Sequence, residues 1–220
     1  MSERLAGDRP VLLDLFCGAG GAAMGYYRAG FDVIGVDINP QPRYPFEFVQ
    51  GDATTFDLNG DYAVIHASPP CQLYSVSTVM HDKSQYPDFV DLMRARLMAA
   101  TESGGPGVWI IENVPGAPLR NYVQVCGSGL GMVRIRRHRW FESNVGLMGV
   151  PCAHSLNNDI LSVVGHSEGS GKSGPGYLMA DKQAAMGIDW MNRDELSEAI
   201  PPAYTEHLGL QLITQLKAVA

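Results

Sequence analysis

The chain has 220 residues, of which 45% are hydrophobic, and a formal net charge of -7 at pH 7. That length and apolar content favour one domain with a substantial core over two small lobes. The negative charge argues against general adhesion to nucleic acid, and no apolar run approaches the roughly 18 residues that span a bilayer. Residues 1–4 are polar and lack the apolar segment of a secretory signal. We therefore expect a cytoplasmic protein with no membrane partner.

Short apolar runs alternate with helix-compatible segments over the first 140 residues. This alternation is typical of parallel strands joined by crossover helices. The sequence therefore predicts an α/β fold with a mainly parallel central sheet flanked by helices. Strands are expected at residues 11–16, 33–37, 46–50, 62–67, 108–111, 123–126 and 137–142.

The rest of the chain divides into helical and loop segments. Residues 87–102 carry apolar side chains at helical spacing, which predicts a helix over the sheet. Composition shifts after Ser143, and 168–176 is rich in glycine and serine, as in loops. Further helices are expected at 180–186, from Asp194, and from the proline pair 201–202 through Leu216. The predicted organisation is a core at 1–142, an inserted segment at 143–178 and C-terminal helices at 179–220.

A glycine-rich segment follows the first predicted strand. Its glycines allow a ligand to approach the backbone near a helix N-terminus, although Ala23 stands where the dinucleotide fingerprint has its third glycine. Asp37 and Asp52 end the next two predicted strands, where carboxylates can accept from ribose hydroxyls and an adenine amino group. These features favour a nucleoside ligand over the alternatives, a tight turn and solvated carboxylates. The segment consists of Phe16, Cys17, Gly18, Ala19, Gly20 and Gly21.

Two reactive groups follow later strands. Cys71 comes after an apolar run and the prolines Pro69 and Pro70, which suit a rigid loop better than the inert core thiol that is the alternative. Glu112 ends the run 108–111, where poor solvation can keep a carboxyl protonated and able to donate a proton. A capping or salt-bridged glutamate is the alternative there. The sequence thus predicts a nucleophile and an acid at one sheet edge.

Four arginines lie close together near the last predicted strand. Because side chains alternate along a strand, Arg137 and Arg139 share one face and can meet a phosphate or a base. A solvated edge strand protected by charge is the alternative. The arginines are Arg134, Arg136, Arg137 and Arg139.

The four cysteines are too few and too scattered for a disulfide framework, so reduced thiols are expected. Cys152 and His154, with His166, suggest zinc. A tetrahedral structural site needs a fourth ligand and paired spacing, which this set lacks. The sequence therefore predicts no metal site.

These motifs together resemble the DNA cytosine-5 methyltransferase family. The family's cofactor, nucleophile and acid motifs are matched by residues 14–21, 69–75 and 112–114. Its arginine motif is matched by Arg137 and Arg139, with its glutamine lost. Looser likeness to the last two motifs lies at 184–190 and 198–204, where the usual asparagine is replaced near Glu198.

The resemblance implies a Rossmann-like methyltransferase fold and S-adenosylmethionine as methyl donor. It further implies that Cys71 attacks C6 of a flipped cytosine, that Glu112 meets N3, and that Arg137 or Arg139 lies near O2. The donor would be bound by Phe16, Cys17, Gly18, Ala19, Gly20, Gly21, Asp37, Ile38, Asp52, Ala53 and Pro69.

The implied partner is DNA, either double-stranded with base flipping or single-stranded. Residues 143–178 are short for the family's target-recognition region, which suggests limited readout or a protein partner that supplies specificity. The small size suits a phage or bacterial restriction-modification system, and hence a bacterial cytoplasm or nucleoid. Two alternatives stay open. One is a non-catalytic DNA- or partner-binding relative. The other is an exocyclic-amino methyltransferase, because residues 68–70 partly resemble the polar Pro-Pro loop of that group.

Overall fold

The computed structural model describes residues 9–74, 87–154, 160–163 and 178–219. Its centre is a seven-stranded sheet in the order β3-β2-β1-β4-β5-β7-β6. Strand β7 pairs antiparallel with both β5 and β6, and the other pairings are parallel, which confirms the mainly parallel sheet. The strands are β1 (Val11–Leu15), β2 (Asp32–Asp37), β3 (Glu47–Gln50), β4 (Val64–Ala67), β5 (Val108–Asn113), β6 (Val123–Cys126) and β7 (His138–Ser143).

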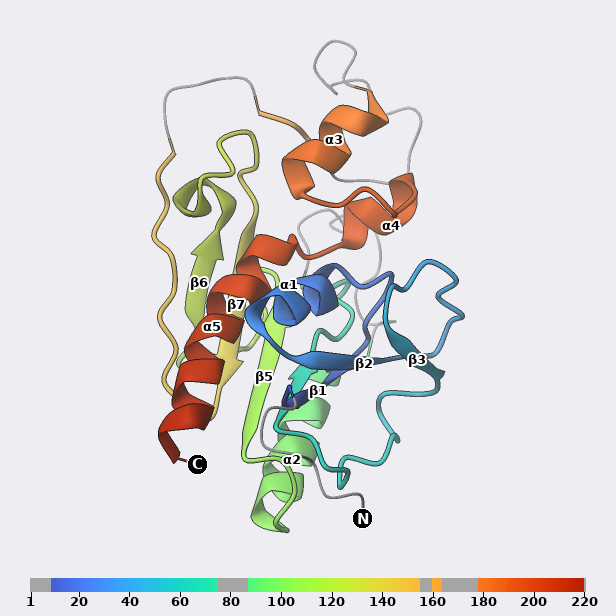
Figure 1. Cartoon of the computed structure of the whole chain (residues 1–220), viewed down its shortest axis with the longest axis vertical. Helices are drawn as coiled ribbons and strands as arrows, with labels where there is room; N and C mark the ends of the chain where they lie inside the picture. The colour runs from blue at the N-terminus through green and yellow to red at the C-terminus, as the bar shows by residue number, and fades with distance from the viewer. Residues whose placement is uncertain (1–8, 75–86, 155–159, 164–177, 220) are drawn as a thin grey trace.

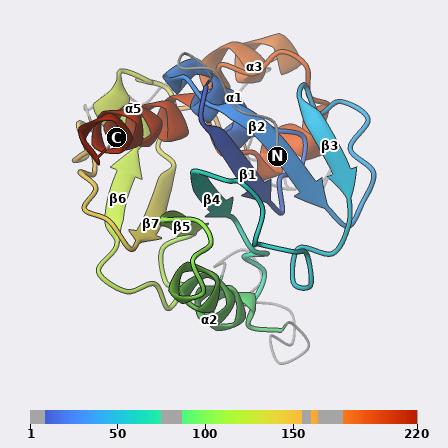
Figure 2. The same cartoon turned by 60° about the horizontal axis from the view of Figure 1, so that its bottom comes forward.

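Helices cover both faces of the sheet (Figures 1 and 2). One face carries α1 (Gly21–Ala29) and α5 (Pro202–Val219), and the opposite face carries α2 (Phe89–Glu102). Close contact between α1 and α5 requires a glycine, because a Cβ added at Gly25 would lie 2.1 Å from the carbonyl oxygen of Pro202. Two short helices, α3 (Met179–Met186) and α4 (Arg193–Glu198), lie at the top of Figure 1.

Each face of the sheet buries its own apolar cluster. Tyr26 and Tyr204, both 0% exposed, fill the side of α1 and α5, whereas Met93 and Leu97 of α2 pack over the other side. Strand β4 is buried along its whole length, as expected for a central parallel strand covered on both faces. Among the described residues, no helix combines the length and the apolar character that crossing a membrane requires.

Three connections between strands contain no helix. Residues 38–46, 51–63 and 114–122, which join β2 to β3, β3 to β4 and β5 to β6, form turns without a helix. Asp52 and Asp57 accept backbone hydrogen bonds from residues two positions later, at 2.8 and 3.0 Å, and such bonds favour turns over helix.

Strand order places the expected site at the point where the sheet reverses its winding. The chain runs outward from β1 to β3 on one side and from β4 to β5 on the other. Ligands of open α/β sheets bind outside the carboxyl ends of the strands at such a switch point. The segments after β1, β2 and β4 and the end of β5 meet there.

Candidate active site

The loop after β1 is built for close approach to its backbone. Phe16, Gly18 and Gly20 have φ angles of 59°, 49° and 87°, in the left-handed region. At Gly20 an added Cβ would lie 2.8 Å from Cδ of Pro45, so glycine is required for packing. At Gly18 no heavy atom of the described structure lies within 4 Å of such a Cβ. The loop therefore has room for a ligand at Gly18.

Asp37 ties this loop to the end of β2. Its Oδ2 accepts from the backbone N–H of Gly18 at 3.0 Å, and its Oδ1 accepts from that of Asn39 at 2.9 Å. Each carboxylate oxygen has a second lone pair, so both can accept a further hydrogen bond. Ile38, next in the chain, is 64% exposed, which makes an apolar surface available beside the carboxylate. This pair suits a nucleoside with a hydroxylated sugar.

Asp52 lies in the turn after β3, with its carboxylate exposed. Oδ1 accepts from the Thr54 backbone N–H at 2.8 Å and from its hydroxyl at 2.7 Å. These hydrogen bonds lower the pKa of Asp52, which keeps it an anionic acceptor. Ala53 is buried, and its carbonyl accepts from Arg96 at 2.8 Å, which anchors the turn to α2.

Residues from the C-terminal part of the chain cover the glycine-rich loop. The indole N–H of Trp190 donates to the carbonyl of Ala19 at 2.8 Å, and a Cβ added at Gly21 would lie 2.4 Å from the Ile200 carbonyl oxygen. Trp190 was absent from the predicted site residues, although its segment resembles a family motif. The adjacent Cys17 is buried, and burial strongly raises the pKa of its thiol, so it is no nucleophile.

The Pro-Pro-Cys loop is fixed to the ends of two strands. Pro69, itself buried, accepts a hydrogen bond at its carbonyl from the Asn113 side chain at 2.9 Å. The backbone N–H of Ser68 donates to the Leu15 carbonyl at 3.1 Å. The backbone N–H of Tyr74 donates to the Cys71 carbonyl at 3.0 Å. These bonds fix the loop that carries the partly exposed Cys71 to the ends of β1 and β5.

Cys71 lies within electrostatic reach of the other predicted catalytic residues. Its pKa is raised, first by burial and also by Glu112, whereas Arg139 and Arg137 act to lower it. The free protein thus favours the thiol, and the two arginines stabilise the thiolate that a nucleophile needs.

Glu112 lies inside β5, where the prediction had placed it just after the strand. Glu112 is 5% exposed, and Nε of Arg139 lies 2.8 Å from its Oε1. Glu112 is therefore salt-bridged, which was one of the alternatives left open by the sequence. The pair is not aligned as a hydrogen bond, and Oε1 has no hydrogen-bond partner among the described residues. Burial raises the pKa of Glu112, opposed by Arg139, His66 and Arg137. A buried carboxyl with an open acceptor atom can exchange a proton with a bound ligand.

The two predicted arginines have different contacts. Arg139 is buried beside Glu112, whereas Arg137 donates to the carbonyls of Val163, at 3.4 Å, and Ser197. The pKa of Arg137 is lowered to about 9, mainly by burial and then by Arg139. Arg137 therefore ties the site to residues 160–163 and to α4.

A buried pair behind Glu112 was missed by the sequence analysis. His66 Nδ1 lies 2.8 Å from Asp14 Oδ1, and both side chains are 0% exposed. His66 belongs to β4 and Asp14 to β1, so the pair lies in the middle of the sheet. The available signal was a polar residue inside each of two apolar runs.

Comparison with known proteins places the chain among methyltransferases. The family model described as C-5 cytosine-specific DNA methylase matches residues 11–122. Type II methyltransferase M.AplI of Arthrospira platensis is 30% identical over 122 residues, which are 50% of this chain and 33% of the relative. The match thus spans about a third of that relative's length. The residues matched by the family model, 11–122, include Cys71 and Glu112.

Two solved structures share the fold. One is described as a DNA modification methyltransferase encoded within an E. coli prophage, with a TM-score of 0.63 at 15% identity, covering 94% of this chain and 99% of that one. The other is the Entamoeba histolytica methyltransferase EhMeth, with a TM-score of 0.59 at 13% identity, covering 95% and 99%. At these identities the likeness concerns the fold alone.

Proposed function

Because the chain belongs to the C-5 cytosine-specific DNA methylase family, we propose that it transfers a methyl group from S-adenosylmethionine to C5 of cytosine in DNA. Membership of this family supports the class of enzyme that the motifs predict, a DNA methyltransferase that uses this donor. The observation that carries the proposal for this chain is the meeting of Cys71, Glu112 and Arg139 beside the open loop at Gly18.

We assign the donor to the edge formed by the ends of β1, β2 and β3. When bound, S-adenosylmethionine supplies a methyl group that is activated by the adjacent sulfonium. Gly18 leaves room for the ligand, Asp37 offers acceptors for ribose hydroxyls, and Ile38 offers apolar surface. Asp52 offers an acceptor for an adenine amino group. The further residues assigned to the donor are Phe16, Cys17, Ala19, Gly20, Gly21, Ala53 and Pro69.

Cys71 makes the cytosine ring reactive. Its thiolate adds to C6, and the electron pair of the C5–C6 double bond then makes C5 nucleophilic enough to accept a methyl group. Loss of the C5 proton afterwards expels the thiolate and restores the double bond. Arg139 and Arg137 favour the thiolate, while burial opposes it. The thiol proton passes to solvent water before or during the attack.

Glu112 compensates the charge that develops on the ring. It donates a proton or a hydrogen bond to N3, and burial favours the protonated form that this role needs. Arg139 lies against the same carboxyl and is assigned to the base near O2. Arg137 adds a second positive charge near Cys71, and its guanidinium is held by the Ser197 carbonyl beside α4.

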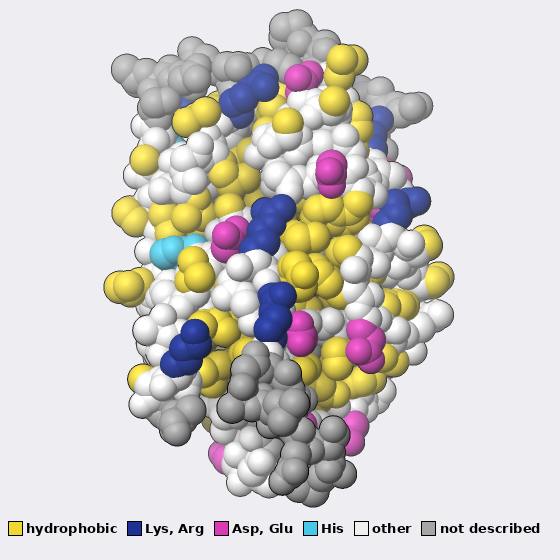
Figure 3. Space-filling model, in the orientation of Figure 1, with side chains coloured by type: hydrophobic (Ala, Val, Ile, Leu, Met, Phe, Trp, Pro, Cys, Tyr) yellow, Lys and Arg dark blue, Asp and Glu magenta, His cyan; other side chains and the backbone are white. Residues whose placement is uncertain are grey.

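The target base must leave the helical stack, because a Cys71 held at a sheet edge cannot reach C6 inside a duplex. On the face seen in Figure 3, arginine and lysine side chains stand apart, with acidic and apolar side chains between them. We propose that contacts to DNA are local and that a protein partner or residues 143–178 supply specificity. A bacterial or phage modification system is the proposed setting, supported by the prophage origin of one structural neighbour.

The decisive experiment uses DNA containing 5-fluorocytosine, which cannot lose a proton from C5. We expect the chain, given donor and this DNA, to form a covalent adduct that survives denaturation, and Cys71→Ser to form none. Nucleoside analysis of ordinary DNA should show 5-methylcytosine. Confirmed donor binding without either product would support the non-catalytic alternative. Methylation at the exocyclic amino group, unaffected by Cys71→Ser, would support an amino-methyltransferase.

A further inference from the structure

A cluster of two cysteines and two histidines lies at one end of the β6–β7 pair, outside the site described above. Cys126 ends β6 and His138 begins β7, and the two residues face each other in the antiparallel register. Cys152 and His154 come from the segment that follows β7. The four ligand atoms all lie within 4.8 Å of one another.

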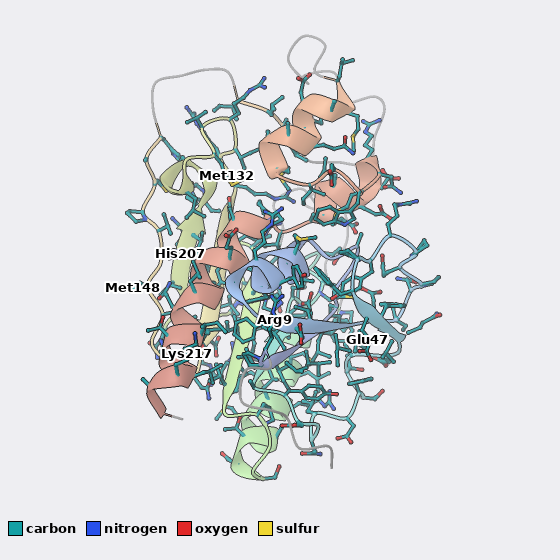
Figure 4. The ribbon with its side chains drawn as sticks, in the orientation of Figure 1. Arg9, Glu47, Met132, Met148, His207 and Lys217 are labelled. Atoms are coloured by element: carbon teal, nitrogen blue, oxygen red, sulfur yellow. The ribbon has the colours of Figure 1, made fainter. Side chains whose placement is uncertain are left out.

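The segment that carries Cys152 and His154 is held in place by contacts of its own. The backbone N–H of Val150 donates to a β6 carbonyl at 2.8 Å. Met148 donates its N–H to a glutamine of α5 at 2.7 Å, and its carbonyl lies 2.9 Å from His207 Nε2. Figure 4 shows Met148 beside His207 at the outer edge of the molecule. The cluster is therefore anchored to both β6 and α5.

Each histidine of the cluster faces a sulfur atom. Nε2 of His154 lies 3.2 Å from Sγ of Cys126, and Nε2 of His138 lies 3.1 Å from Sγ of Cys152. A tetrahedral zinc ion with two sulfur and two nitrogen ligands keeps its ligand atoms about 3.3–3.8 Å apart, given Zn–S of about 2.3 Å and Zn–N of about 2.0–2.1 Å. The four atoms are thus close to the arrangement that zinc requires.

Both sulfur atoms also have polar neighbours. The Ser128 hydroxyl lies 3.1 Å from Cys126 Sγ, and the Gln124 amide donates to Cys152 Sγ at 3.6 Å. The Gln124 amide oxygen accepts from the Trp140 indole at 3.1 Å, which fixes the orientation of the amide. Hydrogen-bond donors stabilise thiolates and orient metal ligands. These contacts therefore help to fix the positions of both sulfur atoms.

We propose that Cys126, His138, Cys152 and His154 bind a structural zinc ion. Two thiolates and two neutral imidazoles form the tetrahedral ligand set that zinc prefers. Each thiol loses one proton on binding, so the ion and its ligands carry no net charge. Four protein ligands leave no open coordination position, which fits a structural role. The ion joins β6, β7 and the following segment next to Arg139.

Metal content tests the site directly. The tag-free chain, purified under reducing conditions and incubated with Zn²⁺ alone, should retain one zinc per chain after gel filtration. Replacement by Co²⁺ should give the visible bands of tetrahedral cobalt and a thiolate charge-transfer band. Cys152→Ser and His154→Ala change exposed residues and should fold. Loss of a residue that only orients a metal ligand lowers metal affinity by roughly 10–100-fold. Each of these variants loses a ligand itself, so each should lower zinc affinity by more than that.

A matched variant outside the cluster serves as the control. Cys71→Ser removes the same type of side chain as Cys152→Ser and should keep the full zinc content. A chelator should lower the thermal midpoint of the parent but not of Cys152→Ser. A parent that retains no zinc, a Cys152→Ser variant that retains all of it, or a Cys126–Cys152 disulfide in the purified chain would overturn the proposal. None of these readouts depends on methylation, so the result is independent of the proposed activity.

Discussion

Nε of Arg139 lies 2.8 Å from Oε1 of Glu112, and their side chains are only 11% and 6% exposed. The two residues lie on neighbouring antiparallel strands, β7 and β5, so the ion pair depends on strand register. Both also act on the Cys71 thiol, with opposite signs. The pair therefore controls the nucleophile as well as the proposed acid.

The first prediction concerns the pKa of Cys71. Arg139→Met removes a cation that stabilises the thiolate, so the pKa of Cys71 should rise further. Glu112→Gln removes an anion that destabilises it, so the pKa should fall. The rate of iodoacetamide alkylation at Cys71, followed by peptide mass spectrometry against pH without DNA, should shift to higher pH in the first variant and to lower pH in the second.

Arg120→Met is the matched control for this pair. The Arg120 side chain is 68% exposed and lies 3.9 Å from Asp91, away from Cys71. Its replacement should leave the alkylation profile unchanged. A shift in the same direction for Arg139→Met and Glu112→Gln would show that the electrostatic account of Cys71 is wrong.

The second prediction concerns Asn113, which positions the loop of Cys71. Asn113 is 1% exposed, and its amide donates to the Pro69 carbonyl at 2.9 Å. Asn113→Asp keeps the shape of the side chain but loses its N–H donor. The Pro69 carbonyl then lacks its hydrogen bond, and loss of a buried hydrogen bond costs about 1–3 kcal/mol of free energy. We expect kcat to fall about tenfold to hundredfold, with donor affinity nearly unchanged.

Asn144→Asp is the control for Asn113. The Asn144 amide donates to the Gly107 carbonyl at 2.9 Å, near the opposite end of β5. This variant should lower stability without changing kcat relative to its folded fraction. Equal effects of the two variants on kcat would contradict a positioning role for Asn113.

Several strand positions could be predicted from the sequence because β1, β4 and β5 are short apolar runs, each followed by a loop or residue with polar character. Those polar ends also located Cys71 and Glu112 at one edge of the sheet. The contact of Glu112 with Arg139 could not be predicted, because it depends on the register between β5 and β7. The missing helices between strands had a signal in the turns at Asp52 and Asp57, which the alternating pattern outweighed.

The cluster at the end of β6 shows a related limit. Cys152 and His154 alone gave an incomplete ligand set, and His166 lies outside the described residues. The other two members of the cluster come from β6 and β7, where antiparallel pairing places Cys126 opposite His138. Sequence spacing does not encode that pairing, so a search for paired zinc ligands along the sequence does not find this cluster.

The third prediction separates ligand binding from backbone strain at Gly18. Its φ of 49° lies in the left-handed region, which costs a non-glycine residue about 1–2 kcal/mol, and its Cβ position is open. Gly18→Ala should therefore lower the free energy of unfolding by about 1–2 kcal/mol. It should also weaken binding of S-adenosylmethionine, measured by calorimetry, because the added methyl occupies the space assigned to the donor.

Gly104→Ala provides the control for that variant. Gly104 has a φ of 88° and an equally open Cβ position, but it follows α2 away from the loop. It should show a similar loss of stability with unchanged donor affinity. Full donor affinity in Gly18→Ala would mean that the donor does not approach this part of the loop.

The last prediction concerns a buried ion pair that joins α2 to β7. Nε and Nη2 of Arg94 donate to the two oxygens of Glu142 at 2.7 and 2.8 Å, and the side chains are 4% and 5% exposed. Arg94 also donates to the Pro118 carbonyl at 2.7 Å, and Glu142 accepts from the Arg120 backbone N–H at 2.7 Å. The pair thus links α2 and β7 to the connection before β6.

Removing one partner leaves a buried charge uncompensated, whereas removing both does not. Arg94→Met should lower the free energy of unfolding by about 3–5 kcal/mol, measured by urea denaturation. The double variant Arg94→Met with Glu142→Leu should be more stable than Arg94→Met alone, although the backbone groups of Pro118 and Arg120 each lose a partner. Strictly additive losses in the double variant would show that the two side chains do not interact energetically.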